Sequence, residues 1–207
     1  MLRRSQLAVS TACCDAERGF RLSEAPERTI LGCNARNRGN VVASIREMDA
    51  MKLALTGGCQ CGGLRYELTE SPRLTYACHC TDCQRMTSTA FSMAIVVPEA
   101  AFRLTKGEPR SIQRTADSGH LTIRWVCPDC GSWICGAPRT SAATPGAVRA
   151  IRAGTLDDTS WLHATTHFWT RSKQPWIALP EGSHVFETQP SDLIGFFASG
   201  GQAKPGQ

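Results

Sequence analysis

Cys127-Pro128-Asp129-Cys130-Gly131 decides the fold of this chain. Two cysteines at this spacing form a knuckle that brings both sulfurs to about 2.3 Å from one zinc ion. The proline fixes the backbone at the start of the turn, and the glycine tolerates the positive φ that follows. A knuckle supplies only two of the four ligands of a structural zinc site, so the sequence must hold a partner pair.

Two more cysteine clusters lie upstream of the knuckle. The first is Cys59 and Cys61 in GGCQCGG, where the flanking glycines let the backbone fold around an ion at little steric cost. The second is the triad Cys78, Cys80 and Cys83 in CHCTDC. With the knuckle these are seven of the eleven cysteines, which matches one closed site of four thiolates and one open site of three. Spacing alone leaves open which cluster completes the knuckle.

The alternative to metal binding is a disulfide framework, which requires an oxidising compartment. The N-terminus does not read as a signal peptide, because the apolar run at residues 7–9 is short and residues 13–18 carry charges. Acidic residues among the arginines argue against a mitochondrial presequence, and no stretch approaches transmembrane length. We therefore expect a cytoplasmic protein whose clustered cysteines bind zinc.

Composition fits one globular domain. The chain has 207 residues, of which 42% are apolar and 20% charged, enough to bury a core without the help of a metal. The metals are therefore expected to do more than hold a small fold together. The net charge of +5 is too small and too evenly spread to indicate a nucleic-acid partner, although it is compatible with a small anionic substrate.

Three segments are expected along the chain. Residues 1–50 show no helical or strand periodicity and are interrupted by glycine and proline, which predicts an N-terminal extension with little stable structure. Met51 begins MKLALTGGCQC, which reads like a natural protein start. Residues 51–198 are expected to form the folded domain, and residues 199–207 a flexible tail.

The folded domain is predicted to be mainly β. Alternating or β-rich apolar runs indicate strands at 64–68, 91–97, 111–115, 121–126, 147–153 and 165–170. Turn signals such as Lys106-Gly107-Glu108-Pro109 separate these runs. Helix is expected only as one or two turns, at 80–86 and 98–102.

The ordered motifs GGCQCGGLRYE, CHCTDCQR, RWVCPDCGSWICG, AGTLDD and THFW…PW resemble the glutathione-dependent formaldehyde-activating enzyme family, also called the centromere protein V-like domain. The resemblance covers about residues 54–187. It implies a β-tent fold, in which β-sheets pack around zinc sites and helices are few and short. It also implies the pairing of the cysteines. The structural zinc ligands carried over are Cys59, Cys61, Cys127 and Cys130, and the catalytic zinc ligands are Cys78, Cys80 and Cys83.

This chain departs from the family pattern at two positions. Val126 stands where phenylalanine is usual, which is a core substitution of little consequence. Ser88 stands where members commonly have glycine. Because a glycine there would provide either a positive φ or a close backbone approach, its loss predicts a substrate pocket of altered shape.

An open zinc held by three thiolates is suited to thiol and aldehyde chemistry, since zinc lowers the pKa of a bound thiol or polarises an aldehyde oxygen. The resemblance implies a carbon–sulfur lyase with two zinc ions per chain, acting on S-hydroxymethylglutathione or a related adduct of a small thiol and an aldehyde. The alternatives are a non-catalytic zinc module that binds a partner, and a thiol or metal sensor. A fourth protein ligand at the triad, such as Cys135 or a histidine, would favour the module.

Other polar residues are weaker candidates. His167, in THFW, matches a histidine of the family and is expected to act either as a proton carrier near the zinc or as a structural residue. Arg85 and Lys173 are candidates for binding substrate carboxylates, although exposed basic side chains are usually only solvated. His79 lies between two ligands and is expected to orient a cysteine or to face solvent. Cys135 is expected to be a buried, inert thiol.

Overall fold

The computed structural model describes residues 55–116, 119, 121–138 and 147–202. Within these residues the chain is mainly β, with two sheets, two α-helices and short 3-10 turns, so the predicted fold class is confirmed. The extension predicted for residues 1–50 lies outside the described residues, as do residues 203–207. In the described part of the chain, no helix is long and apolar enough to cross a membrane.

The smaller sheet has three antiparallel strands in the order β1-β2-β5. They are β1 (Leu55–Gly58), β2 (Arg65–Leu68) and β5 (Phe102–Lys106). Alternation along β2 buries Tyr66 and Leu68 and leaves Arg65 and Glu67 partly exposed. The turn between β1 and β2 carries Cys59 and Cys61, so this sheet presents the first cysteine pair.

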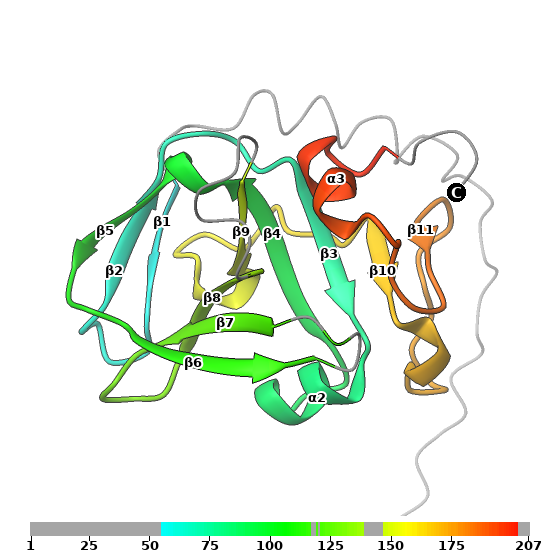
Figure 1. Cartoon of the computed structure of the whole chain (residues 1–207), viewed down its shortest axis with the longest axis horizontal. Coiled ribbons are helices and arrows are strands. Elements are labelled where there is room, and N and C mark those ends of the chain that lie inside the picture. Colours follow the sequence, from blue (N-terminus) through cyan, green and yellow to red (C-terminus); the bar gives the residue numbers. More distant parts are fainter. Residues whose placement is uncertain (1–54, 117–118, 120, 139–146, 203–207) are drawn as a thin grey trace, which may run out of the picture. The chain divides into compact units, whose positions relative to one another are not determined.

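The larger sheet has eight strands in the order β11-β10-β3-β4-β9-β8-β7-β6 (Figure 1). In chain order they are β3 (Leu74–Cys78), β4 (Ser92–Pro98), β6 (Arg110–Thr115), β7 (Leu121–Val126), β8 (Trp133–Pro138), β9 (Val148–Arg152), β10 (Thr166–Phe168) and β11 (His184–Val185). Strand β10 is parallel to its neighbours β3 and β11, and the other pairs are antiparallel. The sheet thus carries the triad at the end of β3 and the knuckle between β7 and β8.

Two hydrophobic clusters pack on opposite faces of the larger sheet. Strand β4 separates them because its side chains alternate: Ile95 and Val97 belong to the first cluster, and Ala94 and Val96 to the second. All four side chains are fully buried, so β4 is the central strand of the core. The smaller sheet closes the first cluster, and helix α3 (Leu193–Ala198) closes the second.

The helices are short, as predicted. Helix α2 (Thr81–Thr87) follows β3 and corresponds to the turn expected at 80–86. The turn expected at 98–102 is the 3-10 helix η1 (Glu99–Ala101). Two further 3-10 turns are η3 (Ala153–Thr155) and η4 (Thr170–Ser172).

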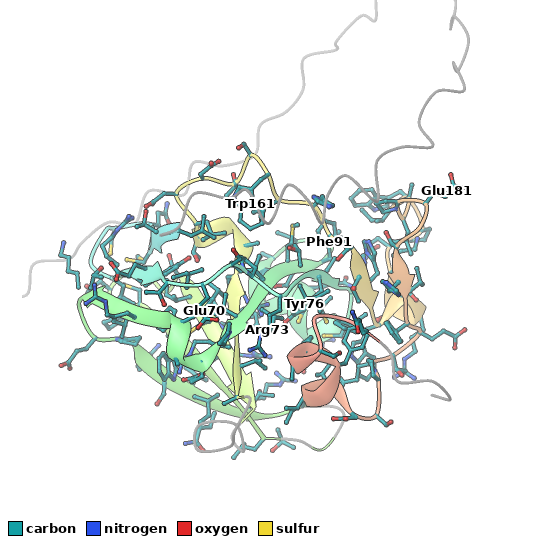
Figure 2. The ribbon with its side chains drawn as sticks, turned by 90° about the horizontal axis from the view of Figure 1, so that it is seen from above. Glu70, Arg73, Tyr76, Phe91, Trp161 and Glu181 are labelled. Atoms are coloured by element: carbon teal, nitrogen blue, oxygen red, sulfur yellow. The ribbon has the colours of Figure 1, made fainter. Side chains whose placement is uncertain are left out.

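Helix α3 was not predicted, and it anchors the start of the expected tail. Arg73, beside α3 in Figure 2, donates from Nη1 to the carbonyl of Ala198 at 3.2 Å. Gly201 donates its N–H to the carbonyl of Phe196 at 2.9 Å. Residues 199–202 of the expected tail therefore pack against the helix. Figure 2 also shows Tyr76 in the interior, where it joins the second hydrophobic cluster under α3.

Candidate metal centres and an adjoining cavity

The knuckle and the first cysteine pair meet in space. The sulfur of Cys61 lies 3.4 Å from that of Cys59 and 3.7 Å from that of Cys127, and all four sulfurs, including Cys130, lie within 4.8 Å of one another. Four sulfurs held tetrahedrally at about 2.3 Å from one zinc ion are about 3.8 Å apart. The arrangement therefore fits a closed four-thiolate site, with the pairing that the family resemblance implied.

Backbone hydrogen bonds shape both turns of this centre. The N–H of Leu64 donates to the sulfur of Cys59 at 3.1 Å. In the knuckle, the N–H of Gly131 donates to the carbonyl of Cys127 at 3.1 Å. Gly131 has φ 73°, a conformation that glycine adopts without steric cost. The two turns are thus built to present sulfurs, as the sequence predicted.

Ser132 joins the two turns, and sequence reasoning did not single it out. Its Oγ accepts a hydrogen bond from the N–H of Gln60 at 3.1 Å and lies 3.2 Å from the sulfur of Cys130. The hydroxyl, followed by the backbone N–H of the same serine, lowers the pKa of Cys130 to about 5. Cys130 therefore gives up its proton readily, as a metal ligand must. A hydroxyl directly after a knuckle is the signal that could have identified this supporting contact.

The triad comes from one short segment. Cys78 ends β3, Cys80 caps the N-terminus of α2, and Cys83 lies in the first turn of that helix. The N–H of Cys83 donates to the sulfur of Cys80 at 3.3 Å, and the three sulfurs lie within 4.8 Å of one another. The end of β3 and the first turn of α2 therefore bring the three sulfurs together without closing a long loop.

The three thiols of the triad shift one another's pKa values in opposite directions. The neighbouring thiols, first Cys78 and then Cys83, hold the pKa of Cys80 well below its usual value. The thiols of Cys80 and Cys83 raise the pKa of Cys78 well above its usual value. One proton leaves easily and the next is retained, because a second thiolate would be repelled by the first. A divalent cation that prefers sulfur relieves this repulsion, so the donor set fits a metal ion such as zinc.

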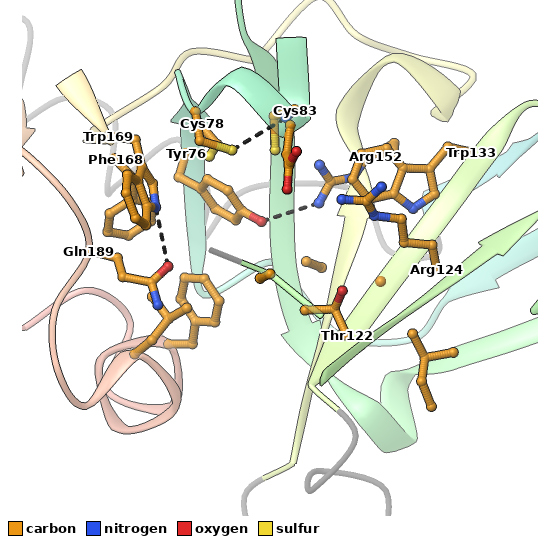
Figure 3. Close-up of a pocket in the computed structure, with 18 residues that line it drawn as sticks. Tyr76, Cys78, Cys83, Thr122, Arg124, Trp133, Arg152, Phe168, Trp169 and Gln189 are labelled. Atoms are coloured by element: carbon orange, nitrogen blue, oxygen red, sulfur yellow. Dashed lines mark hydrogen bonds between the residues drawn. The ribbon is translucent and has the colours of Figure 1, made fainter. Parts of the chain in front are cut away.

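The triad opens onto a cavity of about 180 Å³ (Figure 3). Its wall includes Tyr76 and Phe168 from the second hydrophobic cluster, so the cavity lies on the second face of the larger sheet. Figure 3 shows two arginines, Arg124 from β7 and Arg152 from β9, on the side opposite Phe168 and Trp169. The cavity therefore joins three sulfurs, an aromatic wall and two cationic groups.

No fourth histidine, cysteine or carboxylate ligand joins the triad among the residues that the structure describes. Cys135 belongs to the first hydrophobic cluster, and burial raises its pKa to about 12, as expected for an inert thiol. Asp82 lines the cavity but forms an ion pair with Arg114. The triad thus offers three protein donors and leaves one direction free toward the cavity.

His167 lies behind the triad and does not line the cavity. The next residue, Phe168, lines it, and successive side chains of a strand point to opposite faces. Nδ1 of His167 lies 3.1 Å from Nε2 of His79, and both rings are buried. Burial lowers the pKa of both residues, that of His79 to about 4. Both rings are therefore neutral near pH 7, and one donates its N–H to the other.

The backbone of His79 is fixed by three hydrogen bonds. Its N–H donates to the carbonyl of Phe168 at 2.9 Å. Its carbonyl accepts from Nε2 of Gln84 at 2.7 Å and from Oγ of Ser172 at 3.0 Å. Because His79 stands between two triad cysteines, these contacts orient the ligands on either side of it.

The two basic residues predicted to bind carboxylates lie away from the cavity wall. Arg85 is exposed on α2. Lys173 donates from Nζ to the carbonyls of Gln174 and Ile177 at 3.1 and 2.7 Å. A contact of either residue with a substrate stays a prediction.

Two residues of the chain other than glycine adopt a positive φ in the described segments, and both lie near the triad. Ser88 has φ 54° and ends α2, donating its N–H to the carbonyl of Gln84. The serine thus keeps the positive φ that the usual glycine would adopt freely, at a cost of about 1 kcal/mol. Trp169 has φ 60° and lines the cavity, and its indole N–H donates to Oε1 of Gln189 at 3.3 Å. A bulky residue in this region is rare, so the cavity wall holds backbone strain.

Comparison with known proteins identifies the family of this chain. The family model of the glutathione-dependent formaldehyde-activating enzyme matches residues 54–172. A crystal structure of a Rhodobacter sphaeroides protein is 15% identical, covers 63% of this chain and 98% of that chain, and has a TM-score of 0.38. The family match spans more than half of the chain and includes all seven clustered cysteines. The chain therefore belongs to the glutathione-dependent formaldehyde-activating enzyme family.

Proposed function

We propose that this chain is a zinc-dependent carbon–sulfur lyase that forms and cleaves the adduct of a small thiol, such as glutathione, with formaldehyde or a related aldehyde. In the forming direction the thiol sulfur bonds to the aldehyde carbon, and the thiol proton ends on the aldehyde oxygen. The reverse direction breaks the same carbon–sulfur bond and returns both reactants. Neither direction needs an oxidant or a reductant.

The observation that carries the proposal is the open side of the triad. A structural zinc site is closed by four protein ligands, whereas a catalytic site keeps one position for water or substrate. The four-cysteine centre offers four protein donors, which suits the first kind of site, and the triad offers three donors that line a cavity, which suits the second. An interaction module has no need for an open ligand position next to a cavity, so the enzyme is favoured.

In this proposal the four-cysteine centre and the triad each hold one zinc ion. The structural ligands are Cys59, Cys61, Cys127 and Cys130, and the catalytic ligands are Cys78, Cys80 and Cys83. When bound at the triad, zinc would lower the pKa of a substrate thiol and polarise an aldehyde oxygen.

The remaining residues of the site bind and position. Phe168 and Trp169 form an apolar wall that excludes water from a bound aldehyde. His79 and His167 act as positioning residues, because their hydrogen bond holds the chain between two catalytic ligands. A proton carried directly by His167 would first require its ring to reach the cavity.

The proposal is tested by elemental analysis for zinc together with exchange NMR of glutathione and formaldehyde. The wild-type chain is expected to carry two zinc ions and to accelerate exchange between free and adduct forms. Cys80→Ser should carry one zinc ion, remain folded and lose the acceleration. Cys135→Ala, which leaves the four-cysteine centre and the triad intact, should keep both ions and the activity. Equal acceleration by Cys80→Ser and wild type would refute a catalytic role for the triad.

A further inference from the structure

Arg124 and Arg152 share one small space in the cavity, although their positive charges repel each other. Their Cζ atoms lie 4.9 and 4.0 Å from the ring centroid of Trp133. Arg124 projects from β7 and Arg152 from β9, and both line the cavity that contains the triad (Figure 3). Two guanidinium groups held this close to one ring need a source of negative charge to offset their repulsion.

Within the described segments, no carboxylate forms an ion pair with either group. Arg152 is 7% exposed; it donates to Oγ of Ser92 at 2.7 Å and to the hydroxyl of Tyr76 at 3.2 Å. Its Nε is buried and has no hydrogen-bond partner. A buried cation with an unused donor is costly, because the lost hydration is not replaced.

Asp82 is the carboxylate on the cavity wall, and its partner is Arg114. Asp82 therefore does not neutralise the charges of Arg124 and Arg152 on the same wall. By contrast, the buried Arg149 on the other face of β9 pairs with Glu99. The chain does supply a carboxylate where an arginine is purely structural.

We infer that Arg124 and Arg152 form an anion subsite that binds a carboxylate of the thiol substrate. This inference rests on the proposed function and adds the substrate class: a thiol that carries a carboxylate, bound with its sulfur at the triad and its carboxylate at the arginine pair. Guanidinium groups bind carboxylates through paired N–H donors, and a ring face beneath them keeps their planes in place. Esters and other uncharged forms of the same thiol lose this contact and are poor substrates.

A second source of negative charge is the triad itself, since three thiolates around one zinc ion leave a net charge of −1. In this alternative, the two arginines stabilise the charge of the metal centre and do not determine which substrate binds. The two accounts differ in outcome: removing an arginine from an anion subsite changes substrate preference and leaves the zinc content unchanged. Removing an arginine that serves the thiolates lowers zinc content and leaves preference unchanged.

The test compares glutathione with glutathione diethyl ester, which has the same thiol and no free carboxylates. We expect wild type to prefer glutathione in kcat/KM, and Arg124→Gln to reduce that preference by about 10-fold or more, as for the loss of a charged hydrogen bond. Activity toward the ester should fall much less than activity toward glutathione, and the zinc count should not change. Arg103→Gln, at an exposed arginine of the smaller sheet, is the matched control and should keep the preference.

Three results overturn the inference. One is an equal loss of activity toward glutathione and its ester in Arg124→Gln. Another is loss of the second zinc ion from that variant with unchanged preference. The third is a selective loss in Arg85→Gln or Lys173→Gln with none in Arg124→Gln, which would assign the carboxylate to those residues. Arg124→Lys should restore part of the preference, because it returns the charge without the paired donors.

A binding measurement separates this inference from the proposed reaction. S-methylglutathione keeps both carboxylates but has no thiol to react, so its binding by calorimetry does not depend on turnover. Binding to wild type that weakens about 10-fold or more in Arg124→Gln, and not in Arg103→Gln, supports the subsite even if no exchange reaction is seen. If wild type and Arg124→Gln bind S-methylglutathione equally well while exchange activity is present, the subsite is refuted and the proposed lyase activity is not.

Discussion

Substitution of Cys127 is predicted to damage the fold far more than substitution of Cys80. Cys127 lies in the knuckle between β7 and β8 of the larger sheet, and its partners Cys59 and Cys61 lie in the turn between β1 and β2 of the smaller sheet. The metal centre therefore ties together two sheets through segments distant in sequence. The triad joins only residues 78–83, which β3 and α2 already hold in place.

The magnitude follows from the energy of structural zinc sites. Such sites contribute on the order of 10 kcal/mol of apparent folding free energy, and total stability of a domain is about 5–15 kcal/mol. Removal of one of four ligands, at a cysteine that is itself 1% exposed, is expected to cost roughly 5 kcal/mol in Cys127→Ser. For a domain of this size that loss lowers Tm by roughly 10–20 °C. In Cys80→Ser the four-thiolate centre stays intact, so we expect a drop of only a few degrees.

The assay is thermal unfolding by circular dichroism in metal-buffered solution, with zinc counted for each variant. Cys127→Ser should melt early and lose its structural ion, whereas Cys80→Ser should melt near wild type with one ion left. The same contrast is expected on mild chelation, which should remove the triad's ion first. Near-normal melting of Cys127→Ser, or simultaneous loss of both ions, would refute the division of the cysteines into a closed and an open centre.

Three further predictions concern the remainder of the chain. A protein that starts at Met51 should melt at the same temperature and bind the same metal as the full chain, because the family match begins at residue 54; a marked loss of stability would show that residues 1–50 contribute to the fold. Ser88→Gly should stabilise the protein by up to about 1 kcal/mol, since it relieves the strain of φ 54°, whereas Thr89→Gly should not; equal effects would argue against strain at Ser88. The buried, neutral His167 has a lowered pKa, so its contribution to stability is complete above the unfolded value of about 6.5 and is lost as pH falls below it. His167→Gln should therefore lose less stability than wild type between pH 7.5 and pH 5 in urea titrations, and parallel curves would contradict a buried neutral ring.

Sequence reasoning found strands in which apolar and polar residues alternate along the sequence. Strand β2, whose side chains alternate between buried and partly exposed, was predicted within a residue, and strand β7 was predicted with its observed bounds. Strand β3 was missed because all five of its residues are buried, so that no alternation marks it. Its partner β10 pairs with it in parallel from about ninety residues away, and local patterns carry no information on such a pairing.

The cysteines of the candidate site could be read from the sequence, whereas the groups around them could not. Closely spaced cysteines indicate metal ligands, because thiols at such spacings have few other uses in a protein without disulfide bonds. Arg124 and Arg152 occupy alternate positions of ordinary strands, where an arginine usually faces solvent. Their role depends on which face of the larger sheet is covered by α3, a helix that the sequence did not predict.

The position of the two cysteine centres suggests why one fold can carry both. The four-cysteine centre packs against the first hydrophobic cluster, and the triad against the second. Strand β4, in which residues 94–97 are fully buried, stands between these clusters. In the proposed function, the substrate therefore binds on a face whose cysteines come from one short segment, while the cysteines that join the two sheets lie beyond the central strand. In the proposed function, residues of the cavity at the open centre can then change without altering the four cysteines proposed to hold the stabilising metal.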